Sequence, residues 1–303
     1  MSATPKRNLP ASVRQRLLTL SQQRQQPFDL ILVRYAVERL LYRLSCSAHA
    51  NRFVLKGAML FAVWSDTLHR PTRDVDLLGI GPSERAALKT AFVDLCGLDV
   101  EPDGLRFLPD SVAAESIRDE EAYPGTRITL EARLDNARIP VQVDIGFGDA
   151  VTPAAEEIEF PTLLEFPAPH LRAYPHYTVV AEKLEAMVRL GAANSRMKDF
   201  FDLWYLSRSF PFDGSQLVAA IERTFARRQM ALPAETPTGL TVEFAALKAS
   251  QWSAFIRRNA LTPTEIAPVL EAIRTFGLPP LHAAAAGTPF VGKWTPAEGW
   301  LRP

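Results

Sequence analysis

The 303-residue sequence has only two cysteines, Cys46 and Cys96, and this scarcity excludes a disulfide-based framework. Both cysteines lie in apolar or helical contexts, and neither has partners at the spacing that a metal site or a catalytic thiol would need. We therefore expect two reduced, buried thiols with a packing role in a reducing compartment.

Long apolar runs are also missing from the sequence. No stretch approaches the length of a membrane-spanning helix, and residues 1–17 lack the apolar centre of a secretion signal. We expect a cytoplasmic protein with no membrane association. With 47% hydrophobic residues, the chain can still fill the core of one large domain or of two modest ones.

Net charge is absent as well, because 34 basic residues balance 34 acidic ones. A protein that coats nucleic acid is usually basic. The balance therefore indicates either a small substrate or a nucleic acid held by a local basic patch.

Two helices are expected near the start, one with Ser12 as its N-cap. Their arginines, among them Arg39 and Arg43, are most simply read as a solvated face.

The segment Asn51–Gly81 carries the sharpest pattern in the chain. Acidic and aliphatic residues alternate from Asp74 to Leu77, which predicts a strand with Asp74 and Asp76 on one face. Adjacent carboxylates repel each other, and Mg²⁺ binds one or two carboxylates together with substrate phosphates. An isolated Asp-x-Asp is more often a solvated strand, so the reading depends on the residues around it.

The residues ahead of this strand indicate a phosphate site. An apolar run leads into Lys56-Gly57, and a short helical pattern follows. Backbone N–H groups and the helix dipole favour phosphate at such a junction, and a glycine lets the phosphate approach closely. Thr72 lies two residues before Asp74 and is expected to share its face.

A hairpin is predicted further along, with strands at 127–132 and 139–145 around a turn at 135–138. Asp144 lies on the polar face of the second strand, and taken alone it reads as an exposed acid beside a turn. Another strand is expected at 156–160. Beyond Pro175 the apolar period changes from two to three and four, which marks the passage to a helical half.

The stretch 178–209 holds a second group of candidate residues. Lys183 lies in the apolar stripe of a predicted helix, where a lysine either extends to solvent or meets the negative charge of a ligand. The next predicted helix begins near Arg196 and carries Asp199 and Asp202, which fall near one helical face. Either aspartate could be the functional acid.

Together these residues resemble the AbiEii/AbiGii toxin family of the polymerase-β-type nucleotidyltransferase superfamily. The matching strings are Gly57-Ala58, Arg70-x-Thr72-x-Asp74-x-Asp76, Glu182-Lys183-Leu184 and Arg196-x-Lys198-Asp199-x-x-Asp202-Leu203. Ala58 and Met59 depart from the family pattern, which often has a second glycine, a serine or a threonine there. This departure removes a hydroxyl but leaves the backbone cradle. The resemblance covers roughly residues 54–206, about half of the chain.

The resemblance implies a metal-dependent nucleotidyltransferase that moves a nucleoside monophosphate from an NTP to an acceptor. It assigns catalytic roles to Asp74, Asp76, Lys183 and Asp199. Metal ligands would be Asp74, Asp76 and Asp144, holding Mg²⁺ or alternatively Mn²⁺. Nucleotide-binding roles fall to Lys56, Gly57, Thr72, Lys183 and Arg196.

The resemblance further implies the toxin of a toxin–antitoxin pair that acts on RNA, with tRNA as the acceptor and a cognate antitoxin protein as partner. Two alternatives stay open. One is a nucleotidyltransferase for small molecules of the antibiotic type, and the other is a non-catalytic nucleotide- or RNA-binding protein with the same fold. A pure binding protein has no need of mutually repelling carboxylates, which counts against the latter.

The expected fold class is α/β, with a small mixed sheet and flanking helices followed by an all-helical C-terminal lobe. The predicted domains are 1–165, the nucleotidyltransferase domain with its N-terminal helices, and 166–303, a helical domain that completes the active-site cleft.

Overall fold

The computed structural model describes residues 8–65, 70–117 and 125–301. The chain divides into two compact units. The first runs to Gly148 and also contains Glu156–Ala173, whereas the second contains Asp149–Ala155 and the chain from Tyr174 onward. The domain boundary placed at residue 165 from the sequence stays a prediction.

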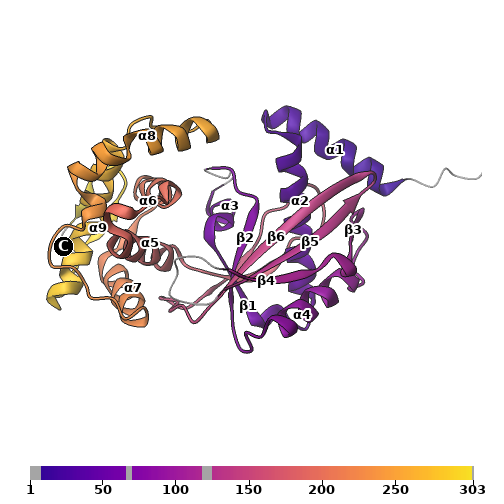
Figure 1. The fold of residues 1–303 in the computed structure, drawn as a ribbon, viewed down its shortest axis with the longest axis horizontal. Coiled ribbons are helices and arrows are strands. Elements are labelled where there is room, and N and C mark those ends of the chain that lie inside the picture. Colours follow the sequence, from indigo (N-terminus) through magenta and orange to yellow (C-terminus); the bar gives the residue numbers. More distant parts are fainter. Residues whose placement is uncertain (1–7, 66–69, 118–124, 302–303) are drawn as a thin grey trace, which may run out of the picture. The chain divides into compact units, whose positions relative to one another are not determined.

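A large mixed sheet forms the centre of the first unit (Figure 1). Its strand order is β3-β5-β6-β2-β1-β8-β7, with β4 beside β5. The strands are β1 Phe53–Lys56, β2 Asp74–Gly79, β3 Leu105–Phe107, β4 Ala113–Ile117, β5 Gly125–Leu134, β6 Ala137–Phe147, β7 Glu156–Glu159 and β8 His170–Ala173. The helices of this unit are α1 Leu9–Arg24, α2 Phe28–Cys46, α3 Phe61–Trp64 and α4 Arg85–Gly97. The expected hairpin is therefore confirmed as β5 and β6.

The two faces of this sheet differ in polarity because side chains alternate along each strand. On β5 every second residue is buried, from Thr126 to Leu134, while the residues between them are partly exposed. β6 alternates in the same way. Helices α1, α2 and α4 pack against the sheet, and Phe92 of α4 meets Phe53 of β1 edge-on. The polar residues of β2, β5 and β6 therefore share one face.

The second unit consists mainly of helices, as the change in periodicity predicted. They are α5 His176–Leu190, α6 Met197–Ser209, α7 Gly214–Arg227, α8 Val242–Asn259 and α9 Ala267–Ala286. The α/β fold class is confirmed. The structure adds a three-stranded antiparallel sheet of β9 Phe212–Asp213, β10 Lys293–Thr295 and β11 Gly299–Leu301. These strands are too short for an alternating pattern to reveal them.

Tryptophans of the C-terminal tail hold this small sheet in place. Trp294 and Trp300 both pack on Phe276 of α9, with ring centroids 5.0 and 6.1 Å away. Trp294 Nε1 donates a hydrogen bond to the backbone oxygen of Ser207 at 2.7 Å, and Trp300 Nε1 donates to that of Phe276 at 2.8 Å. Both indole N–H groups therefore have partners, and the tail has a structural role.

Three local expectations were wrong. Helix α1 begins at Leu9 and is capped by the side chain of Asn8, so Ser12 is not its N-cap. Cys46 is exposed at the end of α2, and Cys96 of α4 is only half-buried, so neither thiol is buried as expected. Arg39 and Arg43 are buried, with 0% and 6% exposure, instead of forming a solvated face. Within the described residues, no helix is long and apolar enough to cross a membrane.

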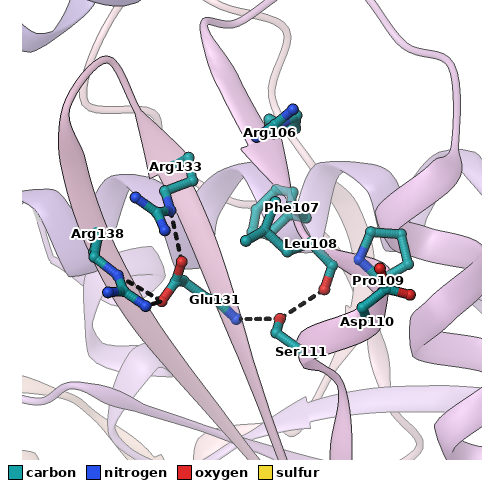
Figure 2. Close-up of a pocket in the computed structure, with 9 residues that line it drawn as sticks. All are labelled: Arg106, Phe107, Leu108, Pro109, Asp110, Ser111, Glu131, Arg133 and Arg138. Atoms are coloured by element: carbon teal, nitrogen blue, oxygen red, sulfur yellow. Dashed lines mark hydrogen bonds and ion pairs between the residues drawn. The ribbon is translucent and has the colours of Figure 1, made fainter.

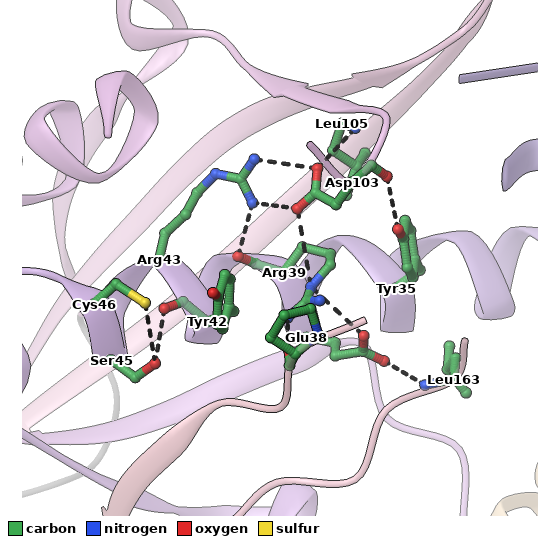
Figure 3. A network of polar contacts seen from close by, with 11 residues as sticks. Tyr35, Glu38, Arg39, Tyr42, Arg43, Ser45, Cys46, Asp103, Leu105 and Leu163 are labelled. Atoms are coloured by element: carbon green, nitrogen blue, oxygen red, sulfur yellow. Dashed lines mark hydrogen bonds and ion pairs between the residues drawn. The ribbon is translucent and has the colours of Figure 1, made fainter. Parts of the chain in front are cut away.

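A buried polar network in the first unit explains why these arginines are inside (Figure 3). Arg43 donates two hydrogen bonds to the Asp103 carboxylate, at 2.6 and 3.2 Å. Arg39 donates to the backbone oxygen of Pro167 at 2.6 Å, and its Nε lies 3.6 Å from Glu38. The other oxygen of Glu38 accepts from the backbone N–H of Leu163 at 2.7 Å. Burying these charges is tolerable only because each has a partner.

This network makes the stability of the protein depend on pH. Burial raises the pKa of Glu38 from its usual value of 4.5 to about 7. Between these two values the folded state holds a proton that the unfolded state has released, so the free energy of unfolding falls as pH rises. Glu38→Gln removes this dependence. As pH rises from 5 to 8, the free energy of unfolding of the variant should therefore increase by on the order of 2 kcal/mol relative to that of wild type.

Urea unfolding at several pH values measures this difference, with Glu84→Gln, an exposed glutamate, as the control. The control should follow the wild-type pH profile throughout. A Glu38→Gln profile parallel to that of wild type would contradict the assignment of Glu38 as the titrating group.

Candidate active site

The predicted site residues fall into two clusters, one in each unit. In the first unit, backbone pairing aligns charged side chains across four adjacent strands. Lys56 of β1 lies opposite Asp76 of β2, and Asp76 lies opposite Asp144 of β6. Asp144 in turn lies opposite Arg127 of β5. Directly opposed residues are about 5 Å apart and share one face, so these four form a continuous row, hereafter the carboxylate row.

Gly57 lies against the Asp76 carboxylate. It has a φ of +75°, a conformation that side chains other than glycine rarely adopt. A Cβ atom at this position would lie only 2.0 Å from Asp76 Oδ2. The chain leaves β1 here and enters a 3₁₀ turn, Gly57–Leu60, followed by the single helical turn α3. Both the backbone conformation and the available space therefore require glycine.

Asp74 and Thr72 lie at the start of β2. Asp74 is the first residue of the strand, is exposed, and lies opposite Gln142 of β6. Thr72 is half-buried in the segment just before the strand. Arg73 between them forms an ion pair with Asp29 of α2, which ties this segment to the helix. Asp74 and Asp76 thus share the polar face that the alternation predicted.

Arg127 binds the carboxylate of Asp144 through two hydrogen bonds. Its Nε and one terminal nitrogen each donate to an Asp144 oxygen at 2.8 Å. The side chain of Gln142 lies beside this pair, within 3.4 Å of both carboxylate oxygens. A bidentate arginine–carboxylate pair is a strong and directional contact. Asp144 is therefore engaged by a cation from its own sheet.

This pairing bears on the metal ligands predicted from the sequence. Asp74 and Asp76 offer the hard oxygen donors that Mg²⁺ prefers, and one or two protein carboxylates are its usual complement. This pair therefore fits such an ion. Among the described residues, however, no group of three His, Cys, Asp or Glu side chains is arranged to hold a metal ion. Asp144 as a third ligand stays a prediction.

The second cluster surrounds Lys183 of α5. Lys183 Nζ lies 2.7 Å from Asp199 and 2.8 Å from Asp202, both on α6. The two aspartates are buried, with exposures of 1% and 0%. Lys183 thus neither extends to solvent nor stands as an isolated charge, and it binds both of the acids between which the sequence could not choose.

Arg196 completes this cluster from the residue just before α6. Its Nε lies 2.7 Å from the second oxygen of Asp199, and its backbone N–H donates to Asn194 at 2.8 Å. Burial would raise the pKa of Asp199, but the positive charges of Lys183 and Arg196 outweigh this effect and lower it. Asp199 is therefore ionised at neutral pH and fixes the directions of both basic side chains.

Sequence reasoning missed two arginines near these clusters. Arg127 could have been found by pairing strand residues outward from the turn at Asp135, which aligns it with Asp144. Arg228 follows α7 and binds three acids of the second unit. Its distances are 2.5 Å to Glu185, 3.3 Å to Asp149 and 3.7 Å to Glu182. No local sequence pattern predicts these contacts. Glu182 and Glu185 lie on α5 on either side of Lys183, so Arg228 holds this part of the helix.

Comparison with known proteins gives one family and two similar structures. The family model described as "Nucleotidyl transferase AbiEii toxin, Type IV TA system" matches residues 39–276, well over half of the chain. No curated protein matches the sequence. The crystal structure of JHP933 from Helicobacter pylori has a TM-score of 0.46 and 13% identity, covering 82% of this chain and 90% of that chain.

A second H. pylori structure, provisionally assigned as a nucleotidyltransferase, has a TM-score of 0.41 and 12% identity. It covers 82% of this chain and 89% of that chain. Scores of this size carry no functional argument, so the family match is the informative comparison.

The close approach of Gly57 to Asp76 predicts an unusual cost for Gly57→Ala. Gly81→Ala is the matched control, because Gly81 also has a positive φ, +88°, but open space around it. Both changes should lower the free energy of unfolding by about 1 kcal/mol, because alanine disfavours this backbone conformation. Gly57→Ala must also displace Asp76, so it should lower the free energy of unfolding by at least about 2 kcal/mol more than the control.

Denaturant unfolding of both variants measures this excess. Repeating Gly57→Ala in an Asp76→Gly background should remove it, because the colliding side chain is gone. Equal costs at the two glycines would show that the carboxylate does not constrain position 57.

Proposed function

The chain belongs to the AbiEii family of nucleotidyl transferase toxins, and from this premise we propose that it transfers a nucleoside monophosphate from an NTP to an RNA acceptor. The reaction releases pyrophosphate and depends on Mg²⁺ or Mn²⁺. In phosphoryl and nucleotidyl transfer the protein contributes mainly positioning and electrostatic stabilisation. The residues of the two clusters supply both.

The observation that carries this proposal is the carboxylate row, in which Asp76 lies between Lys56 and Asp144 with Gly57 against its side chain. Two acids in direct register repel each other, and this arrangement costs stability unless cations offset it. Lys56 and Arg127 flank the acids on either side. A sheet that only needed to fold would gain nothing from holding Asp74, Asp76 and Asp144 together.

In the proposed reaction, Asp74 and Asp76 hold the divalent ion, which supplies positive charge for the phosphate oxygens when bound. Lys56 and the backbone at Gly57 bind the phosphates, with Thr72 beside them. Asp144, now paired with Arg127, would either hold the ion together with these two aspartates or direct Arg127 toward the phosphates. In both cases the acid controls where a positive charge lies at the end of the row.

Lys183 and Arg196 contribute further positive charge for the nucleotide. Asp199 holds each of them at 2.7 Å, so neither must be ordered when the nucleotide binds. Such preorganisation lowers the cost of binding. Asp202 shares Lys183 with Asp199, and we assign it the same positioning role.

The type IV toxin–antitoxin assignment of the family supports an antitoxin protein as partner. We propose tRNA as the RNA acceptor and the cytoplasm as the site of the reaction. These assignments rest on the family resemblance and on the nucleotidyl transfer chemistry proposed for the carboxylate row.

A labelling experiment tests the proposal. Purified protein is incubated with Mg²⁺, total bacterial RNA and each α-³²P-labelled NTP in turn, and the products are resolved on a denaturing gel. Wild type should label an RNA band with at least one nucleotide. Asp74→Asn, Asp76→Asn and Lys183→Ala should each lower the rate by at least about 100-fold, because each removes a charge that the transferring group needs.

The control is Asp99→Asn, which removes an exposed acid just after α4 and should leave the rate unchanged. Label that enters a small molecule but no RNA would favour an antibiotic-type transferase. Nucleotide binding without any transfer would favour a non-catalytic binding protein and contradict the proposal.

A further inference from the structure

A second row of charges crosses the same sheet of the first unit, away from the carboxylate row. Arg106 of β3 lies directly opposite Arg133 of β5, and Arg133 lies directly opposite Arg138 of β6 (Figure 2). We call these three residues the arginine row. Like charges in direct cross-strand register destabilise a sheet. Three arginines at such positions therefore need a reason beyond folding.

Only part of this charge is neutralised within the row. Glu131 accepts a hydrogen bond from Arg133 Nε at 2.6 Å and one from Arg138 Nε at 3.0 Å. The hydrogen bond from Arg138, aided by Arg133, lowers the pKa of Glu131, so this acid is ionised at neutral pH. One carboxylate thus serves two arginines, and in the described part of the chain no ion pair is formed by Arg106.

The arginine row borders an open hollow of about 580 Å³. Apart from Glu131, its other walls are formed by residues 107–111, with Phe107 buried beneath and Asp110 as a second acid. Including both acids, the lining residues still carry an excess of one positive charge. Side-chain exposures of 35% for Arg133 and 68% for Arg138 leave room for a ligand on both. A hollow of this size and charge suits a phosphate-bearing group.

The arginine row and the carboxylate row lie on one face of the sheet. Arg127 and Arg133 are both on β5, where buried and partly exposed residues alternate. Both arginines are among the partly exposed residues, so they lie on the same face. They are six positions apart, which corresponds to about 20 Å along a strand. A stacked nucleic-acid strand advances about 3.4 Å per nucleotide, so this separation spans about six nucleotides.

We propose that the arginine row binds the phosphate backbone of the RNA acceptor, about six nucleotides from the end that reacts at the carboxylate row. This inference rests on the proposed function and adds to it the position of the acceptor. Arginine is suited to this role because its guanidinium forms bidentate contacts with phosphate. Because the arginine row lies at a fixed distance from the carboxylate row, an acceptor shorter than this distance cannot contact both. Transfer to such a short acceptor should not depend on the arginine row.

RNA binding is tested first, without NTP or metal, so that the result does not depend on transfer. The triple variant Arg106→Gln, Arg133→Gln and Arg138→Gln is compared with Arg24→Gln, Arg85→Gln and Lys89→Gln, which removes three exposed charges from α1 and α4. Fluorescence anisotropy with a 20-nucleotide single-stranded RNA should show at least a 10-fold weaker affinity for the first variant and less than a 2-fold change for the second. The slope of log K against log salt should fall by about 2.

Transfer to acceptors of different length is tested next. The triple variant should raise the KM for the 20-nucleotide RNA at least 10-fold while leaving the KM for NTP unchanged. It should not affect transfer to a trinucleotide, which cannot reach from the carboxylate row to the arginine row. Arg106→Gln alone, at a residue without an ion pair in the described chain, should show the same direction of change if the triple variant folds poorly.

The outcomes separate the two proposals. Equal losses in both triple variants, or RNA binding unchanged by the first, would overturn the inference. An acidic protein partner on the arginine row would also leave RNA binding unchanged. Failure of wild type to bind the RNA would overturn the inference as well. Loss of RNA binding in the first variant alone, with no nucleotide transfer by wild type, would retain the RNA site and refute the proposed function.

Discussion

The pairing register of β2 with β6 is the constraint on which the candidate site depends. These parallel strands pair so that Asp76 lies opposite Asp144. Because side chains alternate between faces, a slip of one residue would turn Asp76 into the core and expose both Val75 and Leu77. The apolar residues of the buried face therefore fix the register of the strands, and this register holds Asp76 opposite Asp144. Burial of one face of the sheet holds together the mutually repelling charges on the other.

The order of the charges along the carboxylate row limits this repulsion. Lys56 and Arg127 stand at the outer positions and the two acids at the inner ones, so each acid has a cation on its outer side. Gly57 lets the chain turn immediately beside Asp76 without filling the space in front of it. In the second unit, Lys183 lies between two buried aspartates, which offsets the cost of burying each charge. In both clusters the basic side chains are held in place by acids of their own unit.

Sequence patterns predicted features set by neighbouring residues and missed contacts between residues that are far apart in the sequence. Alternation identified the strand at Asp74 and Asp76, and turn residues identified the hairpin that carries Asp144. Arg39 and Arg43 looked like a solvated face because their partner Asp103 lies sixty or more residues away in the sequence. The pairing of β2 with β6 spans a similar separation. No periodicity encodes such contacts, whereas the position of Arg127 follows from a single turn.

The balanced net charge of the chain is compatible with an RNA acceptor because electrostatic attraction acts locally. At physiological ionic strength the screening length is about 8 Å, so a phosphate responds to charges within one or two side chains. Equal totals of basic and acidic residues therefore do not prevent strong local fields. Here the sheet gathers three arginines at one place and three aspartates at another, on a single face. A phosphate backbone would be attracted at the arginines and repelled at the aspartates, except where a cation covers them. That contrast favours one direction for the strand, with its end at the carboxylates.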